Sequence, residues 1–538
     1  MKLRDHYDWI VLGDHPGALL SASMAARLGL SVLVIPARPA QARIVSDTGQ
    51  VLDFETNFLI GLRALVRSNG LLLECLRRSG MLASEEGHLI RRDDTFPQIL
   101  TRETRLNLPL ADDDLRIECE REFGKELFQK IGLVEALKEA EPEYLRYWFH
   151  LPDRLSLSEK KKPNRAPVPL ALESLRKKLA KNRDISAPVR KTWFGSDQDS
   201  NSLARTLEFR DFENVLRAVW FSASGHINER PKLAEIFHLL VLGRGGAAFK
   251  GGISAYRAFL VQLARKSGAQ IVEQAECRRI FVENGRFLGV QISNYPNMIT
   301  GTGAVLGCSL AEAKERLSAS GRKLFRTLKK TLKPDGWRFT IALSVHHEAI
   351  APGITARMVW QEDAAPPIEI EIANPADYGL REPENKVIFL RTVLPYKEET
   401  LSASYQRLIA TRMFRQLKDL VPFVEYHVAR VYPDFREGDW YAGLLKQKTA
   451  QADMLPDDFS IYAFKSLEAI PFNLLCYSKE GVGSQSGLEG LFVATDESNP
   501  KFGTLGPTIA AVEAIAWLAH RSGLTGPFVV PSSSLPSP

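Results

Sequence analysis

The feature that most constrains this chain is a short apolar stretch near its N-terminus. Trp9–Leu12 has the composition of a buried parallel strand, Gly13–Gly17 predicts a tight turn, and Gly17–Leu28 predicts a buried helix of small and apolar residues. Gly29 is suited to end that helix, and Ser31–Ile35 predicts a second strand. A strand–helix–strand unit of this length is the usual frame for a dinucleotide, whose pyrophosphate lies at the helix N-terminus.

The turn departs from the dinucleotide fingerprint G-x-G-x-x-G/A at its second position. Gly13 and Ala18 match the first and third positions, but His15 replaces the glycine that lets the backbone approach the pyrophosphate. Pro36 stands where an acidic residue usually bonds the ribose hydroxyls, and it has no side-chain acceptor. Three roles stay open for His15: it blocks the pyrophosphate, it binds a phosphate through its ring, or it only packs.

The length of 538 residues exceeds what one hydrophobic core supports and predicts two or more folded units. The five cysteines are far apart and form no CxxC pair, which argues against a disulfide framework or a zinc site and suits a reducing compartment. The N-terminus lacks a secretory apolar region, and no run of 18 apolar residues is present, so we expect no membrane span. These features predict a cytoplasmic protein.

Residues 151–191 hold much of the positive charge. This segment has twelve basic and four acidic residues, whereas the whole chain carries a net charge of +6. It can be a solvated insertion, or a lid on an anionic membrane surface, where each Lys or Arg contributes about 1 kcal/mol. The second interpretation would place the protein at the inner face of a membrane. Nucleic acid is not expected as a partner, because no nucleic-acid-binding motif accompanies the charge.

Further along, the predicted elements change from alternating strands and helices to mostly antiparallel strands. Gln98–Pro109 predicts a hairpin with a polar turn, and Asn284-Gly285 predicts a second one. From Trp337 to Leu394 the strands are joined by turn-rich links, which is typical of a mostly antiparallel sheet. Leu491–Asp496 is a strand that ends on an acid, and a helix is predicted from Pro507 to His520.

Four blocks, in this order, resemble the phytoene desaturase-like branch of the flavin amine oxidase superfamily. They are the N-terminal unit, Gly49–Phe58, Phe249-Lys-Gly-Gly-Ile253 and Gly487–Ala511. The resemblance implies a Rossmann-like FAD/NAD(P)-binding α/β domain built from discontinuous segments, and an α+β substrate domain. It would place the first in residues 1–105, 241–330 and 481–525, the substrate/lid domain in 106–240 and 331–480, and a disordered tail in 526–538.

The resemblance also implies residue roles. Asp496 matches the acid that bonds the ribityl or phosphate region, Cys277 lies where backbone groups hold adenine, and the helix after Gly506 would direct its N–H groups at the flavin ring. No catalytic side chain and no metal ligand is singled out, since the flavin accepts the hydride. The implied cofactor-binding residues are Gly13, His15, Pro16, Gly17, Ala18, Cys277, Asp496, Gly503, Gly506 and Thr508.

Two functions follow from the resemblance. The first is an FAD-dependent oxidoreductase that transfers a hydride from an apolar, isoprenoid- or lipid-like substrate to flavin. The second is a flavin-free member that binds a lipid or prenyl group, as the Rab GDP-dissociation inhibitors do on a similar scaffold. His15 and Pro36 are the residues that separate these alternatives.

Overall fold

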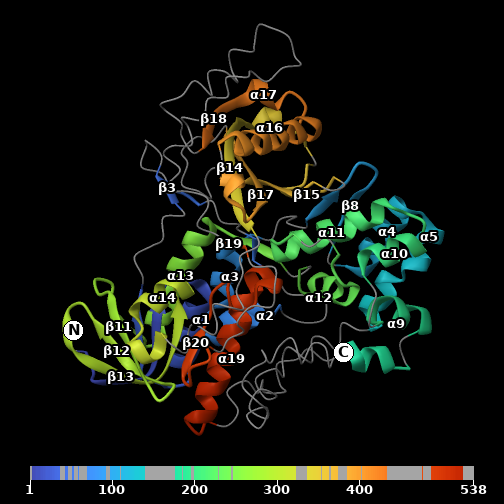
Figure 1. The fold of residues 1–538 in the computed structure, drawn as a ribbon. Helices are drawn as coiled ribbons and strands as arrows, with labels where there is room; N and C mark the ends of the chain where they lie inside the picture. Colours follow the sequence, from blue (N-terminus) through green and yellow to red (C-terminus); the bar gives the residue numbers. More distant parts are fainter. Residues whose placement is uncertain are drawn as a thin grey trace.

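The computed structural model contains a parallel-dominated sheet and a mostly antiparallel sheet, with a group of helices beside them (Figure 1). It describes residues 3–36, 43–45, 51–53, 58–59, 70–91, 97–109, 111–139, 176–183, 186–195, 199–227, 230–243, 246–322, 336–352, 354–362, 365–373, 385–401, 403–432, 475–476 and 486–524. The predicted α/β fold class with a second, antiparallel sheet is confirmed.

The first sheet has the strand order β10-β2-β1-β13-β12-β11, and β20 also pairs with β13. Strands β10, β2, β1, β13 and β20 run parallel, whereas β11 and β12 form an antiparallel hairpin next to β13. The predicted Asn284-Gly285 turn joins that hairpin, and both residues have positive φ. The strands are β1 (His6–Gly13), β2 (Val32–Ile35), β10 (Gln270–Ile271), β11 (Cys277–Glu283), β12 (Arg286–Ile292), β13 (Tyr295–Gly307) and β20 (Leu491–Val493).

Helix α1 (Pro16–Arg27) lies between this sheet and two other helices, α13 (Gly252–Lys266) and α19 (Gly506–Arg521). Nearly every side chain of α1 is buried, as its small apolar composition predicts. Among the described residues one helical stretch, Phe502–Arg521, is long and apolar enough to cross a membrane, whereas the sequence predicted no membrane span. Because 83% of its apolar window is buried, it matches a core helix of a folded domain equally well.

The second sheet has the order β18-β14-β17-β16-β15-β7-β8, with β19 paired to β14. All its described pairs are antiparallel except β15 with β7. Its aliphatic face packs under α16 (Ala403–Leu420), at the top of Figure 1. The strands are β7 (Gln98–Leu100), β8 (Arg105–Asn107), β14 (Gly336–His346), β15 (Arg357–Trp360), β16 (Ile368–Ala373), β17 (Asn385–Pro395), β18 (Val428–Tyr432) and β19 (Leu475–Cys476).

Several helices between residues 112 and 243 were not predicted, above all α11 and α12. Their buried apolar residues belong to the same core cluster as α1 and α19. Residues 176–181 of the basic segment are helical, whereas 151–175 lies outside the described residues. The helices of this region are α4 (Asp112–Phe123), α5 (Lys125–Ile131), α9 (Ala187–Phe194), α10 (Ser200–Thr206), α11 (Asp211–Ser224) and α12 (Leu233–Gly243).

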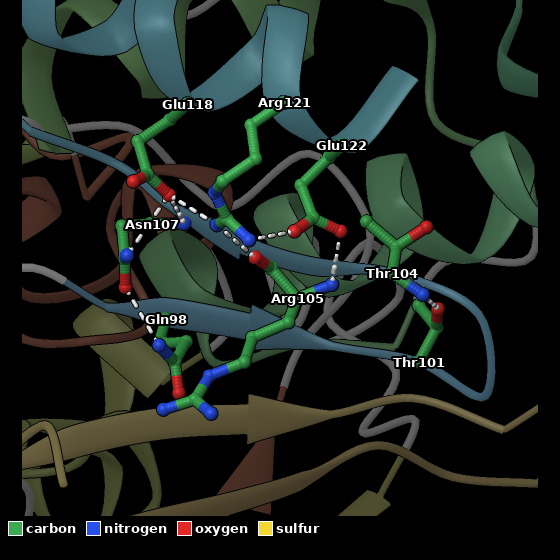
Figure 2. Close-up of polar contacts among 8 residues, drawn as sticks. All are labelled: Gln98, Thr101, Thr104, Arg105, Asn107, Glu118, Arg121 and Glu122. Carbon is green, nitrogen blue, oxygen red and sulfur yellow. Dashed lines mark hydrogen bonds and ion pairs between the residues drawn. The ribbon is translucent and has the colours of Figure 1, made fainter. Parts of the chain in front are cut away.

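The β7–β8 hairpin connects these helices to the second sheet. Figure 2 shows its contacts with α4: Glu118 accepts hydrogen bonds from Asn107, and Glu122 accepts one from the Arg105 backbone N–H. At the end of the hairpin's turn, just before β8, the hydroxyl of Thr104 donates a hydrogen bond of 2.8 Å to Asp211 in the first turn of α11. The hairpin therefore positions the start of α11, whose far end reaches the candidate site.

The remaining described elements are short. Strands β3 and β4 pair with each other, and β5, β9 and β6 form a small sheet. The predicted disordered tail lies outside the described residues, and the domain boundaries stay a prediction. These elements are β3 (Arg43–Val45), β4 (Val51–Asp53), β5 (Phe58–Leu59), β6 (Ile90–Arg91), β9 (Ala247–Phe249), α2 (Leu71–Arg78), α3 (Ala83–Leu89), α14 (Leu310–Arg316) and α17 (Val424–His427).

Candidate functional site

The turn between β1 and α1 is tightly packed against β13. Gly13 has φ +118°, and a β-carbon at this position would lie 2.2 Å from the carbonyl carbon of Gly307. A β-carbon on Gly307 would in turn lie 2.7 Å from that of Ala18. Only small residues fit this crossing of strand, turn and helix, which explains the glycine and alanine of the fingerprint.

His15 occupies the N-terminus of α1 itself. Its backbone is extended, Pro16 follows at the first helical position, and the imidazole Nδ1 accepts a hydrogen bond from the Gly17 N–H at 3.3 Å. With Nδ1 accepting, the ring proton of the neutral form is on Nε2, which lies 3.5 Å from a carboxylate oxygen of Asp496. The ring therefore satisfies one of the helix N–H groups that would otherwise be available to a phosphate.

Asp496 follows β20 and faces the same turn. Its side chain is 54% exposed, while that of His15 is 17% exposed. Desolvation of the carboxyl group works to raise the pKa of Asp496. The ring of His15, and then the charges of Arg338 and Arg257, outweigh this effect and lower the pKa to about 2. The acid is therefore ionised near neutral pH, and it already has a partner within the chain, the ring of His15.

Helix α19 begins beside α1. A β-carbon on Gly17 would lie 2.6 Å from the carbonyl oxygen of Pro507, so the two helix N-termini are in direct contact. Thr508 is buried in the first turn of α19, and a β-carbon on Gly506 would lie 2.3 Å from the backbone oxygen of Asn499. Gly503 lies in the short helix Pro500–Leu505 and packs against the end of α11.

A pocket of about 240 Å³ opens at the carboxyl ends of β1 and β2. Pro36 and Cys277 form part of its wall, and Glu312 and Arg316 of α14, which pair at 2.6 Å, stand at its polar side. Burial raises the pKa of the Cys277 thiol to about 11, so this side chain is a neutral, weakly polar lining group. The pocket has the position expected for the adenosine half of a dinucleotide.

Residues that the sequence singled out, as matches or as departures, thus fall into two separate groups. Gly13, Cys277 and Pro36 line the pocket, while His15 and Asp496 pair at the start of α1. The first group leaves space for an adenosine. The second group does not suit a pyrophosphate, because the His15 imidazole stands at the position of the missing glycine. The ring already contacts both the Gly17 N–H and Asp496. As a whole, the turn does not fit FAD. Whether any of these residues binds a cofactor stays a prediction.

Sequence reasoning missed three residues around Asp496. Arg338 of β14, Arg257 of α13 and His226, just after α11, interact electrostatically with it or with each other. They come from three distant parts of the chain and belong to no motif, so only their meeting in space identifies them. Among the described residues no group of three or more His, Cys, Asp or Glu side chains could hold a metal ion.

Comparison with known proteins identifies the fold. No protein-family model matches the chain, and no curated protein sequence matches it. Among solved structures, an oxidoreductase from Methanosarcina mazei superposes with a TM-score of 0.56 at 14% identity, covering 94% of this chain and 99% of its own. The cyclohexylamine oxidase of Brevibacterium oxydans matches with a TM-score of 0.46 at 14% identity, over 96% and 99% of the two chains.

A Rab GDP-dissociation inhibitor from Plasmodium falciparum matches with a TM-score of 0.44 at 9% identity, over 79% of this chain and 88% of its own. At such identities a match informs on fold alone. The chain has the fold of the Methanosarcina mazei oxidoreductase, an α/β fold with a parallel-dominated sheet and a second, mostly antiparallel sheet, as the sequence resemblance predicted. That fold is shared by unrelated functions, so the function must be argued from the site.

Proposed function

We propose that this protein is a flavin-free ligand-binding member of the oxidoreductase fold. The observation that carries the proposal is His15, whose ring caps α1 through the Gly17 N–H and faces Asp496. A bound pyrophosphate would have to displace this imidazole and then lie beside an ionised carboxylate. Displacing the ring acts against the diphosphate of FAD, because the imidazole already occupies the helix N–H that the phosphates would use.

The loss of the ribose acceptor supports the same proposal. Pro36 at the end of β2 offers neither an N–H nor a side-chain oxygen, so ribose hydroxyls would have no partner from that strand. The two-domain scaffold itself is retained, with a packed core beneath α1 and α19. A scaffold kept without its cofactor contacts is suited to hold another ligand. The proposal includes the ligand that the sequence predicts, which is a lipid or a prenyl group.

The second candidate is an FAD-dependent oxidoreductase that takes a hydride from an apolar, isoprenoid- or lipid-like substrate. The specific observation in its favour is the pocket at the ends of β1 and β2, which is open where an adenosine would lie. For this function His15 would have to rotate away from the Gly17 N–H when the dinucleotide enters.

Purification of the full chain tests the choice. The proposal expects colourless protein that, after incubation with excess FAD and desalting, retains less than stoichiometric flavin by its visible absorbance. Protein that is yellow as purified, or that becomes stoichiometrically yellow with added FAD, would refute the flavin-free function and leave the oxidoreductase.

Membrane association through residues 151–191, at the inner face of a membrane in the cytoplasm, is a further part of the proposal. Two of the basic side chains bond within the chain: Arg176 donates to the Phe194 carbonyl and Arg190 to that of Asn182. Co-sedimentation with liposomes, with and without anionic lipid, tests it. Binding that is indifferent to lipid charge would count against the membrane interpretation.

A further inference from the structure

The turn between α16 and α17 exposes two aromatic side chains. Phe423 is 68% exposed and Tyr426 is 52% exposed, and the centroids of their rings lie 6.4 Å apart. The two residues are three positions apart, so they share one side of the short helix that Phe423 precedes. Val421 and Val424 are fully buried in the core of the second sheet. The turn therefore has one apolar side that packs and another that is exposed.

The backbone of Phe423 is in a left-handed conformation, with φ +67° and ψ +10°. Residues with a β-carbon rarely adopt this conformation, whereas glycine and asparagine do so at lower cost. The turn is held by hydrogen bonds from the Val424 N–H to the Val421 carbonyl, at 3.2 Å, and from the Tyr426 N–H to the Phe423 carbonyl, at 3.0 Å. Asparagine would form the same turn with less strain. Neither the backbone nor core packing therefore accounts for a phenylalanine here, which points to a role for its ring.

The charged side chains beside the two rings balance one another. On the last two turns of α16 and on α17, Lys418 pairs with Glu425 at 2.8 Å, and the exposed Arg415 and Asp419 have opposite charges one helical turn apart. The short helix η1 (His347–Ala349), which contacts α17, adds one exposed acid. Among the described residues, this surroundings carries no excess of positive charge. An anionic partner is therefore not what the exposed rings favour.

The exposed area favours a lipid surface over a protein partner. Together the two rings expose roughly 200–300 Å², whereas a stable protein–protein interface takes about 800 Å² from each partner. A bilayer sets no such minimum, because single aromatic side chains lie at the level of its head groups. Figure 1 shows α17 at the end of the second sheet that is away from α1 and α19. The rings are thus at an outer end of the fold.

We propose that Phe423 and Tyr426 insert into the interfacial region of a lipid bilayer and that this insertion needs no anionic lipid. Tyr426 has an apolar ring and a polar hydroxyl, which suits the boundary between acyl chains and water. The hydrogen-bonded turn fixes the direction of the Phe423 side chain before it meets lipid, so little freedom is lost on binding. This surface lies apart from the turn at His15 and from residues 151–191, and it goes beyond the proposed function.

Co-sedimentation of the full chain with vesicles of pure phosphatidylcholine tests the surface. We expect the wild type to bind, and Phe423→Asn combined with Tyr426→Ser to bind about 10-fold more weakly or less. Asparagine accepts the left-handed backbone, so the variant should fold, which circular dichroism checks. The matched control is Ile117→Ser on α4, where the isoleucine is 61% exposed and its loss should leave binding unchanged.

A direct readout of insertion comes from Phe423→Trp. Its fluorescence should be quenched by acyl-chain-brominated phosphatidylcholine more strongly than that of the wild type. If the double variant does not fold, Phe423→Asn alone is compared with the wild type in the same vesicle assay.

The surface is overturned if the wild type does not bind these vesicles, or if the variants bind as the wild type does. Lost self-association in light scattering, with vesicle binding unchanged, would assign the rings to an interface between copies and also overturn it. Neutral vesicles separate this surface from residues 151–191, whose contribution depends on anionic lipid. A protein that retains FAD would contradict the proposed function only, because vesicle binding is measured in the same way on the loaded protein.

Discussion

Replacing His15 with glycine restores the fingerprint and should increase the affinity for FAD. The change removes the ring that accepts from the Gly17 N–H and faces Asp496. A glycine N-cap costs the helix only a few tenths of a kcal/mol, roughly, so the fold should be retained. Each hydrogen bond to a charged phosphate contributes about 1.5–3 kcal/mol, which corresponds to about 10- to 100-fold in Kd for the first bond that is regained.

The assay is a titration of purified wild type and His15→Gly with FAD, followed by calorimetry or flavin fluorescence. The control is His15→Asn, whose side-chain oxygen also caps a helix and keeps the Gly17 N–H occupied. We expect His15→Gly to gain at least about 10-fold over both. Adding Pro36→Glu to His15→Gly should give a further gain, because the carboxylate restores an acceptor for the ribose.

The result that would refute this reasoning is equal FAD affinity in wild type, His15→Gly and His15→Asn. If all three bind FAD tightly, the imidazole moves aside at no measurable cost and the second candidate function is favoured. If none binds, the pocket at β1 and β2 does not contribute to dinucleotide binding, and the site is altered beyond these two positions.

Three other outcomes follow from the structure. Gly13→Ala should destabilise the protein by about 2 kcal/mol or more in chemical unfolding, because its β-carbon meets the β13 backbone at positive φ; a silent change would contradict the packing of the turn. Arg391→Met should cost about 3–5 kcal/mol, since it removes the buried arginine that pairs with the buried Glu371, and combining it with Glu371→Gln should recover part of that loss. The lowered pKa of Asp496 contributes stability that is complete above about pH 4 and is lost as the pH falls toward about 2; Asp496→Asn should flatten acid unfolding in that window, and an unchanged profile would count against its pairing with His15.

The order of elements could be read from the sequence because local patterns determine it. The apolar run before Gly13 and the small helix after it form β1 and α1, and the Asn284-Gly285 pair forms its hairpin turn. These signals are short-range: a strand buried on both faces must be apolar, and a type I′ turn needs residues that accept positive φ. Helix α11 was not predicted, although apolar residues recur along it at helical spacing from Phe212 to Trp220.

The candidate site likewise has one part that the sequence determines and another that only the tertiary structure determines. The sequence by itself determined that His15 replaces a glycine and that Pro36 replaces an acid, since both follow from position in a motif. Only the tertiary structure decided what His15 does there, because its two partners, Gly17 and Asp496, lie 2 and 481 residues away along the chain. The same holds for Arg338. Strand register and the end of α11 bring its guanidinium next to Gly225, and no local pattern encodes a contact between elements so far apart in sequence.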